Sequence, residues 1–159
     1  MEYKFNQFEF NIDPIAHQSV RQGTSWGGKK VFFKPQKIID YQRELQHQYM
    51  SQIGSDYRTF TGPVKVSIVY VFKYLKKHSK KLIKENEGCI WYKDTKPDLD
   101  SNLNKPFFDA LCGDCISKGL PWTPAIENDS RIANLQAMKI WGPDGKIMLT
   151  IETLENEAL

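Results

Sequence analysis

The sequence predicts an α+β fold, in which helices flank a small mixed β-sheet, organised as a single domain over residues 1–159. Strand patterns near residues 8–12, 64–72 and 131–153 are separated by a helical pattern at residues 36–53 and by a shorter helical pattern further along. The chain has 159 residues, which is the commonest size of one domain. With 40% hydrophobic and 26% charged residues, its composition is that of a globular protein and argues against extended disorder or a coiled coil.

The elements expected in the first half begin with a strand at residues 8–12, where apolar and polar residues alternate. Residues 14–35 are rich in glycine and basic residues, and we expect a long basic loop there. A run of β-branched and aromatic residues at 64–72 predicts a strand that is covered on both faces. A helix is expected over residues 36–53, because apolar side chains recur at helical spacing: Ile38, Tyr41, Leu45 and Tyr49.

The C-terminal part predicts a hairpin and a short helix. Residues 131–141 and 146–153 flank the turn sequence Gly142-Pro143-Asp144-Gly145, which is typical of a β-hairpin. The helix is expected to begin at Asn102 or Asn104, to carry a proline in its first turn and to end near Gly113.

Lysines are concentrated in residues 65–96, where nine of them face three acids, giving a charge of +6 against −3 for the rest of the chain. Their spacing is that of one stripe on an α-helix. The stripe is either a surface that follows DNA phosphates, a solvated helix face, or a loop whose spacing is accidental. The expected DNA contacts are Lys73, Lys76, Lys77, Lys80, Lys81 and Lys84, together with Arg21, Lys29 and Lys30.

A pair of carboxylates follows Pro97, at Asp98 and Asp100. Because Pro97 favours extended backbone before it, and because alternate residues of an extended chain project to the same side, we expect both carboxylates to point together. Leu99 would then turn inward as an anchor. Two neighbouring carboxylates repel each other unless a proton or a cation lies between them. Mg²⁺ suits such a site, because it takes hard oxygen ligands from few carboxylates and from substrate phosphates.

Further charged residues support a site of this kind. A third acid is expected from Glu127-Asn128-Asp129, directly before a predicted strand. Lys105 and Asp109 are four residues apart and therefore share one face of the short helix. An isolated Asp-x-Asp is usually a turn or a cap, but these residues together favour a metal site.

Five short motifs lie within residues 96–132: Lys96-Pro97-Asp98-Leu99-Asp100, Asn102-Leu103, Lys105-Pro106, Phe108-Asp109-Ala110-Leu111 and Asn128-Asp129-Ser130-Arg131-Ile132. Together they resemble the motifs of the RusA-type Holliday junction resolvases. The resemblance implies a homodimeric, Mg²⁺-dependent endonuclease, with Mn²⁺ as another suitable ion, that makes paired nicks in four-way DNA junctions. It also implies a RusA-like fold and a bacterial source, commonly a phage or prophage.

The resemblance also assigns roles to individual residues. Asp98, Asp100 and Asp129 match the metal-binding catalytic acids of the family, and Lys105 matches its essential lysine. Asp109 matches an acid on the family's helix and is a further candidate metal ligand.

The sequence departs from the family pattern at three places. Asp100-Ser101-Asn102-Leu103 is one residue longer than the family's Asp-Asn-Leu, which predicts that Lys105 is displaced along its helix. Asn128 stands where the family has the first acid of an Asp-Asp pair. The connection that precedes Asn128 is long and carries Cys112 and Cys115. No core acid is missing, so we expect the reaction class to be retained.

Two other functions remain open. One is a non-catalytic dimer that binds branched DNA, and the other is a nuclease that acts on flaps or forks. Trp91, Tyr92 and Trp122 lie near the acids, where they either stack on unpaired bases or pack in the core, and we favour packing. Cys112-Gly113-Asp114-Cys115 lacks the further ligands of a zinc site, so we expect incidental thiols.

Several classes of protein are not supported. The motifs of serine hydrolases, zincins and P-loop enzymes are absent from the sequence. No run of about 18 apolar residues exists, so we expect no membrane segment. Three cysteines are too few for a disulfide scaffold, which favours the cytoplasm.

Overall fold

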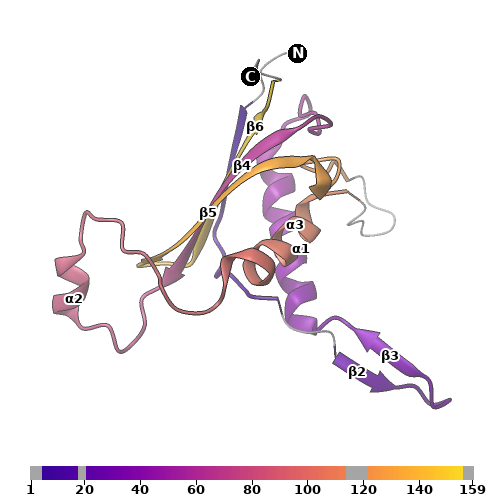
Figure 1. Cartoon of the computed structure of the whole chain (residues 1–159), viewed down its shortest axis with the longest axis horizontal. Coiled ribbons are helices and arrows are strands. Elements are labelled where there is room, and N and C mark those ends of the chain that lie inside the picture. Colours follow the sequence, from indigo (N-terminus) through magenta and orange to yellow (C-terminus); the bar gives the residue numbers. More distant parts are fainter. Residues whose placement is uncertain (1–4, 18–20, 114–121, 156–159) are drawn as a thin grey trace.

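The computed structural model describes residues 5–17, 21–113 and 122–155, which form a mixed four-stranded sheet, a separate two-stranded hairpin and flanking helices (Figure 1). The predicted α+β class is therefore confirmed. The elements are β1 (Phe5–Phe10), β2 (Arg21–Thr24), β3 (Lys30–Phe33), α1 (Gln36–Gln52), β4 (Val64–Lys73), α2 (Lys80–Glu85), a π-helix (Leu99–Asn104), α3 (Lys105–Leu111), a 3₁₀ turn (Asp129–Arg131), β5 (Ile132–Gly142) and β6 (Lys146–Thr153). None of the helices in these ranges is long and apolar enough to cross a bilayer.

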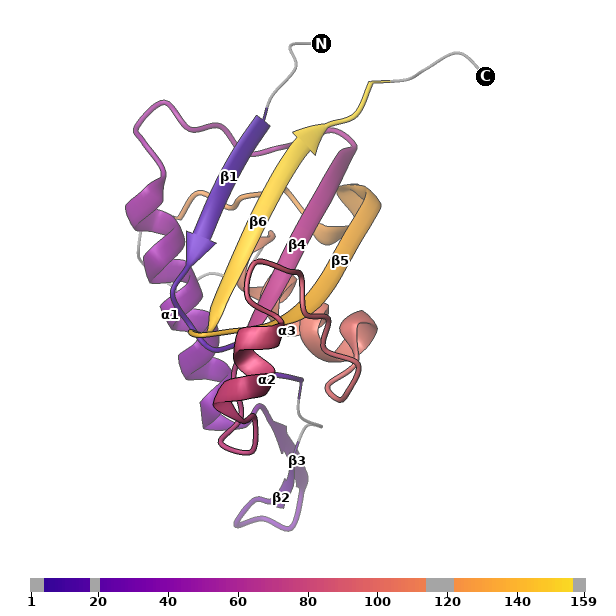
Figure 2. The ribbon, with the colours of Figure 1, turned by 90° about the vertical axis from the view of Figure 1, so that its left-hand side faces the viewer.

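Strand β4 lies in the middle of the large sheet, whose strand order is β1-β6-β4-β5. It pairs antiparallel with β6 and parallel with β5, so these two consecutive strands lie on opposite sides of β4 (Figure 2). The turn at residues 143–145 crosses the end of β4, where the Tyr74 amide donates to the Gly142 carbonyl at 2.9 Å. The predicted hairpin is therefore wrong. The turn reverses the chain as expected, but the apolar strand β4 takes the place between its two arms.

The core lies between one face of this sheet and the helices α1 and α3 (Figure 2). Alternate residues of β4 point into it and are fully or almost fully buried: Val64, Val66, Ile68 and Tyr70. On the other face, Lys65, Ser67 and Val69 are only half-buried, and Val71 near the end of the strand is the buried residue of that face. The expectation that β4 is covered on both faces is thus wrong, and the alternation of β4 is that of a strand with one face toward water.

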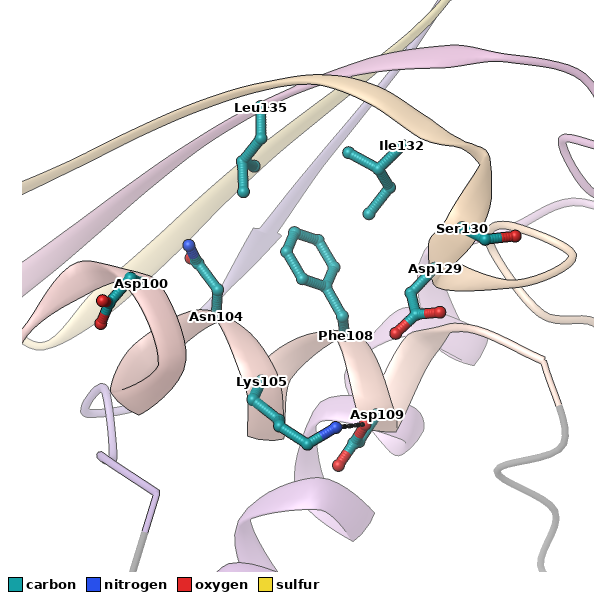
Figure 3. Close-up of a pocket in the computed structure, with 9 residues that line it drawn as sticks. All are labelled: Asp100, Asn104, Lys105, Phe108, Asp109, Asp129, Ser130, Ile132 and Leu135. Carbon is teal, nitrogen blue, oxygen red and sulfur yellow. Dashed lines mark hydrogen bonds and ion pairs between the residues drawn. The ribbon is translucent and has the colours of Figure 1, made fainter.

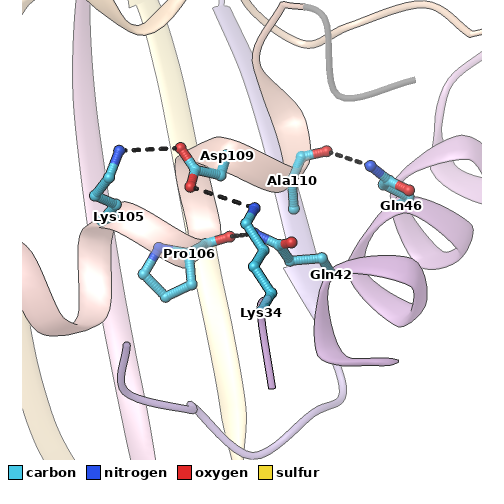
Figure 4. A network of polar contacts seen from close by, with 7 residues as sticks. All are labelled: Lys34, Gln42, Gln46, Lys105, Pro106, Asp109 and Ala110. Carbon is cyan, nitrogen blue, oxygen red and sulfur yellow. Dashed lines mark hydrogen bonds and ion pairs between the residues drawn. The ribbon is translucent and has the colours of Figure 1, made fainter. Parts of the chain in front are cut away.

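The helix expected at residues 36–53 is confirmed as α1, whose apolar stripe is buried against the sheet. Its glutamines fix the neighbouring elements. The Gln42 side chain donates to the Pro106 carbonyl at 2.9 Å, and Gln46 donates to the Ala110 carbonyl at 3.1 Å (Figure 4). Because both acceptors belong to α3, these bonds set the position of α3 on the core.

The stretch expected to be a long basic loop contains the hairpin of β2 and β3. The two strands pair from Arg21 with Phe33 to Thr24 with Lys30. Gly28 has a φ of 74°, a value that glycine adopts readily, and it allows the chain to reverse. The prediction missed the strands because glycines and lysines dominate the composition of this stretch.

The lysine-rich segment does not form one helix. Lys73 ends β4, Lys76 and Lys77 lie in a turn, and only residues 80–85 are helical. Ser79 begins α2 by accepting a hydrogen bond from the Leu82 amide at 3.2 Å. The single helical stripe is therefore wrong, because a new helix begins in its middle. We name residues 74–98 the lysine arm, which projects from the sheet (Figure 1).

Candidate functional site

Helix α3 carries two charged residues on its exposed side. Its other residues, among them Phe107 and Leu111, are buried in the core, which leaves Lys105 and Asp109 on the opposite face. The Lys105 ammonium lies 3.4 Å from one oxygen of Asp109, and the Lys34 ammonium lies 3.9 Å from the other (Figure 4). Asp109 is thus held between two lysines that are far apart in the sequence.

The segment that carries Asp129 is held beside the end of α3 by backbone hydrogen bonds. The Ala125 amide donates to the Leu111 carbonyl at 2.9 Å, and the Gly113 amide donates to the Ile126 carbonyl at 3.1 Å. Gly113 has a φ of 56°, and a Cβ there would lie 3.0 Å from the Glu127 carbonyl oxygen. A glycine is therefore required for this approach.

Asp98 and Asp100 stand at the start of the π-helix. The backbone of Asp98 is extended, with φ −75° and ψ 149°, whereas Asp100 already lies in the first helical turn. The Asn102 amide is 3.4 Å from a carboxylate oxygen of Asp98. We expected the two acids to lie on one extended segment, and this expectation is wrong, because the π-helix begins at Leu99. Leu99 packs against the core, as predicted.

A pocket of about 580 Å³ brings several of these residues together. In Figure 3, Asp100 and Asp129 lie at its two ends, with Lys105 and Asp109 between them on α3. A second hollow of about 630 Å³ shares four of the lining residues, so the two form one continuous depression. The second hollow is lined by Lys34, Phe108, Asp109, Cys112, Gly113, Asn128, Asp129 and Ser130.

Four of the predicted site residues therefore line one pocket, namely Asp100, Lys105, Asp109 and Asp129. Asp98 does not line it. Asn104 also lines the pocket, and its side-chain oxygen Oδ1 accepts a 2.8 Å hydrogen bond from the hydroxyl of Tyr70. Burial of Tyr70 raises the pKa of that hydroxyl. Lys34 is the other residue that the sequence did not indicate. It is 75 positions from Asp109, and nothing near it in the sequence signals that contact.

The comparison with protein families decides the relationship. The model of the family described as endodeoxyribonuclease RusA matches residues 11–152, which is nearly the whole chain. The chain belongs to the RusA family. It is an endodeoxyribonuclease of the Holliday junction resolvase type. A comparison with curated proteins finds no match.

Membership of the RusA family makes the π-helix informative. The chain has one residue more than the family motif between Asp100 and Leu103, and a π-helix holds more residues per turn than an α-helix. A π-helix is a geometry in which an extra residue can be held, and Lys105, which directly follows it, lines the same pocket as Asp100. Lys105 thus lies at the pocket, beside Asp109.

The oxygen donors of this RusA-family pocket suit Mg²⁺. The ion binds through one or two carboxylates together with waters and substrate phosphates. Asp100, Asp109 and Asp129 supply carboxylates, and Asn104 supplies an amide oxygen. Across residues 5–17, 21–113 and 122–155, no three acidic, histidine or cysteine side chains are grouped closely enough to hold an ion by themselves. The hard oxygen donors that line the pocket are of the kind that Mg²⁺ prefers.

The lysine arm is fixed at its root, next to the first motif. The Lys139 ammonium donates to the Thr95 carbonyl at 2.6 Å and to the Pro97 carbonyl at 2.7 Å. The Lys93 ammonium lies 4.3 Å from the centre of the Trp141 ring, and burial and the nearby Lys139 charge lower the pKa of Lys93. These contacts anchor the backbone that leads into Asp98.

The candidate DNA contacts lie outside the pocket. The arm lysines are exposed at Lys76, Lys77, Lys80, Lys81 and Lys84, and Lys73 is exposed at the end of β4. Lys29 and Lys30 are exposed on the β2–β3 hairpin, where Arg21 begins β2.

The remaining aromatic and cysteine candidates are mostly structural. Trp91 lies 4.8 Å from His78 between ring centres, and Trp122 lies 5.6 Å from Tyr49. Both rings pack within the protein, as we expected. Tyr92 is exposed on the lysine arm, so the expectation of packing is wrong for this residue. Cys112 is buried. Cys115 lies outside the described residues.

Proposed function

We propose that this protein is a Mg²⁺-dependent homodimeric nuclease that resolves four-way DNA junctions by paired nicks. The observation that carries this proposal is the pocket that combines Asp100, Asp109 and Asp129 with Lys105. These residues come from two separate segments of the chain, and the family is one of endodeoxyribonucleases.

The roles of the residues follow from phosphodiester hydrolysis. Asp100, Asp109 and Asp129 would supply carboxylate oxygens to an ion in the pocket. Asp98 lies outside the pocket lining and is a candidate ligand through its motif alone. When bound, a divalent ion stabilises negative charge on a phosphate and lowers the pKa of a bound water. Lys105 places a positive charge at the same pocket, where it can stabilise charge that builds on the phosphate. Its ion pair with Asp109 holds the ammonium in position.

The shape and charge of the molecule support a branched substrate. The lysine arm and the β2–β3 hairpin extend in different directions from the body, and both carry exposed lysines (Figure 1). Contacts from such surfaces to phosphates bind DNA without reading its sequence. A junction has two equivalent strands to nick, and a twofold dimer matches that symmetry.

The decisive test is a nicking assay on a mobile four-way junction beside a linear duplex of the same length. We expect Mg²⁺ to support paired nicks in the junction only, and EDTA to stop them. Cleavage of flaps or forks in preference to the junction would replace the substrate in this proposal. Binding of junctions without cleavage in Mg²⁺ or Mn²⁺ would contradict the proposed activity.

Replacing Lys76, Lys80 and Lys84 with alanine should weaken binding to all DNA forms and flatten its salt dependence. Each phosphate contact contributes about 0.9 to the slope of log K against log salt, so three lost contacts lower the slope by about 2.7. The measurement is a titration at several salt concentrations. The control replaces two lysines with alanine, Lys65 and Lys146, which form ion pairs elsewhere on the sheet. An equal slope for the wild type and the triple variant would exclude the arm as a DNA contact.

A further inference from the structure

The β2–β3 hairpin stands apart from the rest of the fold. Its two strands form a sheet of their own, and Figure 1 shows it projecting beyond α1 and α3. An isolated two-stranded hairpin is only marginally stable in water. This hairpin is tied at its base, where Lys34 reaches Asp109 and the buried Pro35 begins α1. The base of the hairpin is therefore adjacent to the candidate active site, while its tip points away.

A tryptophan occupies the tip of this hairpin. Trp26 is fully exposed, with a relative accessibility of 106%. The turn around it is ordered by two backbone hydrogen bonds of 2.9 Å, one between Ser25 and Lys29 and one between Gly28 and Ser25. Covering a large apolar ring with a ligand removes apolar surface from water, which favours binding. The turn therefore presents Trp26 as an available contact.

The two faces of the hairpin differ. Phe33 lies across Gly23, because a Cβ on that glycine would be 3.0 Å from the phenyl ring. Phe32 points to the opposite face, since alternate residues of a strand project to opposite sides. It is 65% exposed and shares its face with Lys30. The second face thus combines the exposed ring of Phe32 with the positive charge of Lys30.

The charge of this region identifies the class of ligand. Between residues 14 and 39 the chain contains five basic residues and no acidic residue. An acidic surface of any kind fits the charge, but exposed aromatic rings among lysines fit DNA in particular. Bases stack on such rings, and phosphates pair with the lysines.

We propose that Trp26 at the tip of the hairpin, with Phe32 on the exposed face of β3 as a second ring, stacks on DNA bases that are exposed where a branch interrupts the duplex. This inference rests on the proposed function. In an intact duplex, neighbouring base pairs cover the faces of each base, whereas a branch point leaves some faces uncovered. The two rings therefore add to the affinity for branched DNA and not to the affinity for linear duplex, whereas the lysines of the hairpin contribute to both. It makes Trp26 a determinant of substrate choice that lies outside the pocket.

The test compares the dissociation constants of a four-way junction and a linear duplex, measured by fluorescence anisotropy in EDTA with the full-length chain. We expect Trp26→Ala to bind the junction about tenfold more weakly, since loss of one base stack typically costs about 5- to 150-fold. Its duplex affinity should stay within about twofold of the wild type, and Trp26→Tyr should restore junction binding. Phe32→Ala serves as the second variant, with the same expected direction.

The salt dependence separates stacking from phosphate contacts. Trp26→Ala removes no charge, so its slope of log K against log salt should equal that of the wild type. The charge variant with Lys29→Gln and Lys30→Gln should lower the slope by about 1.8 on both DNAs.

Three results would overturn the inference. The first is an unchanged junction affinity in Trp26→Ala, and the second is an equal loss of affinity for duplex and for junction in that variant. The third is a difference in molecular mass between Trp26→Ala and the wild type in sedimentation, which would show that a second copy of the chain covers the ring. A wild-type protein without preference for the junction would instead overturn the proposed function itself.

Discussion

Asp129→Asn is expected to abolish cleavage of four-way junctions while leaving the protein able to bind them. Asp129 lines both hollows and faces Lys105 and Asp109 across the pocket (Figure 3). Its loss removes a charged oxygen donor, and we expect the nicking rate in Mg²⁺ to fall by more than about 100-fold. Binding should persist or tighten, because the variant removes a negative charge that repels phosphate. The measurements are single-turnover nicking in Mg²⁺ and junction affinity in EDTA.

The matched control is Asp56→Asn, which makes the same chemical change in an exposed loop after α1. Asp56 lines a different hollow from the candidate site, so its activity should equal that of the wild type. A wild-type nicking rate in Asp129→Asn would show that the assigned acid has no part in the reaction.

Phe107→Ala is expected to produce the largest loss of stability. The ring is fully buried behind the pocket and meets Phe10 at 5.6 Å and Tyr70 at 6.1 Å between ring centres. Truncation of a buried phenylalanine costs about 3 to 5 kcal/mol of the free energy of unfolding. For a chain of this size, the melting temperature should fall by roughly 10 °C. Thermal unfolding followed by circular dichroism measures the change.

The control for stability is Phe32→Ala. The Phe32 ring is exposed, so the same truncation leaves no cavity inside the protein. Its melting temperature should stay within about 2 °C of the wild type. Equal melting temperatures for the two variants would contradict the description of the core around α3.

The periodic patterns of the sequence predicted individual helices and strands, but not how the strands pair. The apolar spacing of α1 and the β-branched run of β4 have clear periods, and both elements form where expected. The partners of each strand depend on contacts between distant residues. The turn at residues 143–145 predicts that the chain reverses, but it carries no information about the strand that enters between β5 and β6.

The sequence motifs predicted which residues line the candidate site more fully than the spacing arguments predicted how these residues are arranged. The motifs named the four charged residues that the pocket brings together. The spacing argument for Asp98 and Asp100 did not hold, because it assumed an extended chain where a π-helix begins. The lysine periodicity failed for a similar reason, although Ser79 is a cap residue that marks the start of a new helix. Lys34 and Trp26 required the structure, since only the fold shows what they contact or leave exposed.

The place of β6 has a consequence for how the protein is made. In the part of the chain that the structure describes, β1 pairs with β6, with Phe10 opposite Ile147. A ribosome adds about 5 to 20 residues per second, so the nascent first strand waits roughly 7 to 27 s for its neighbour. A chain that ends before β6 leaves a gap between β1 and β4, where β6 belongs. The four-stranded sheet can therefore close only after the ribosome has added β6.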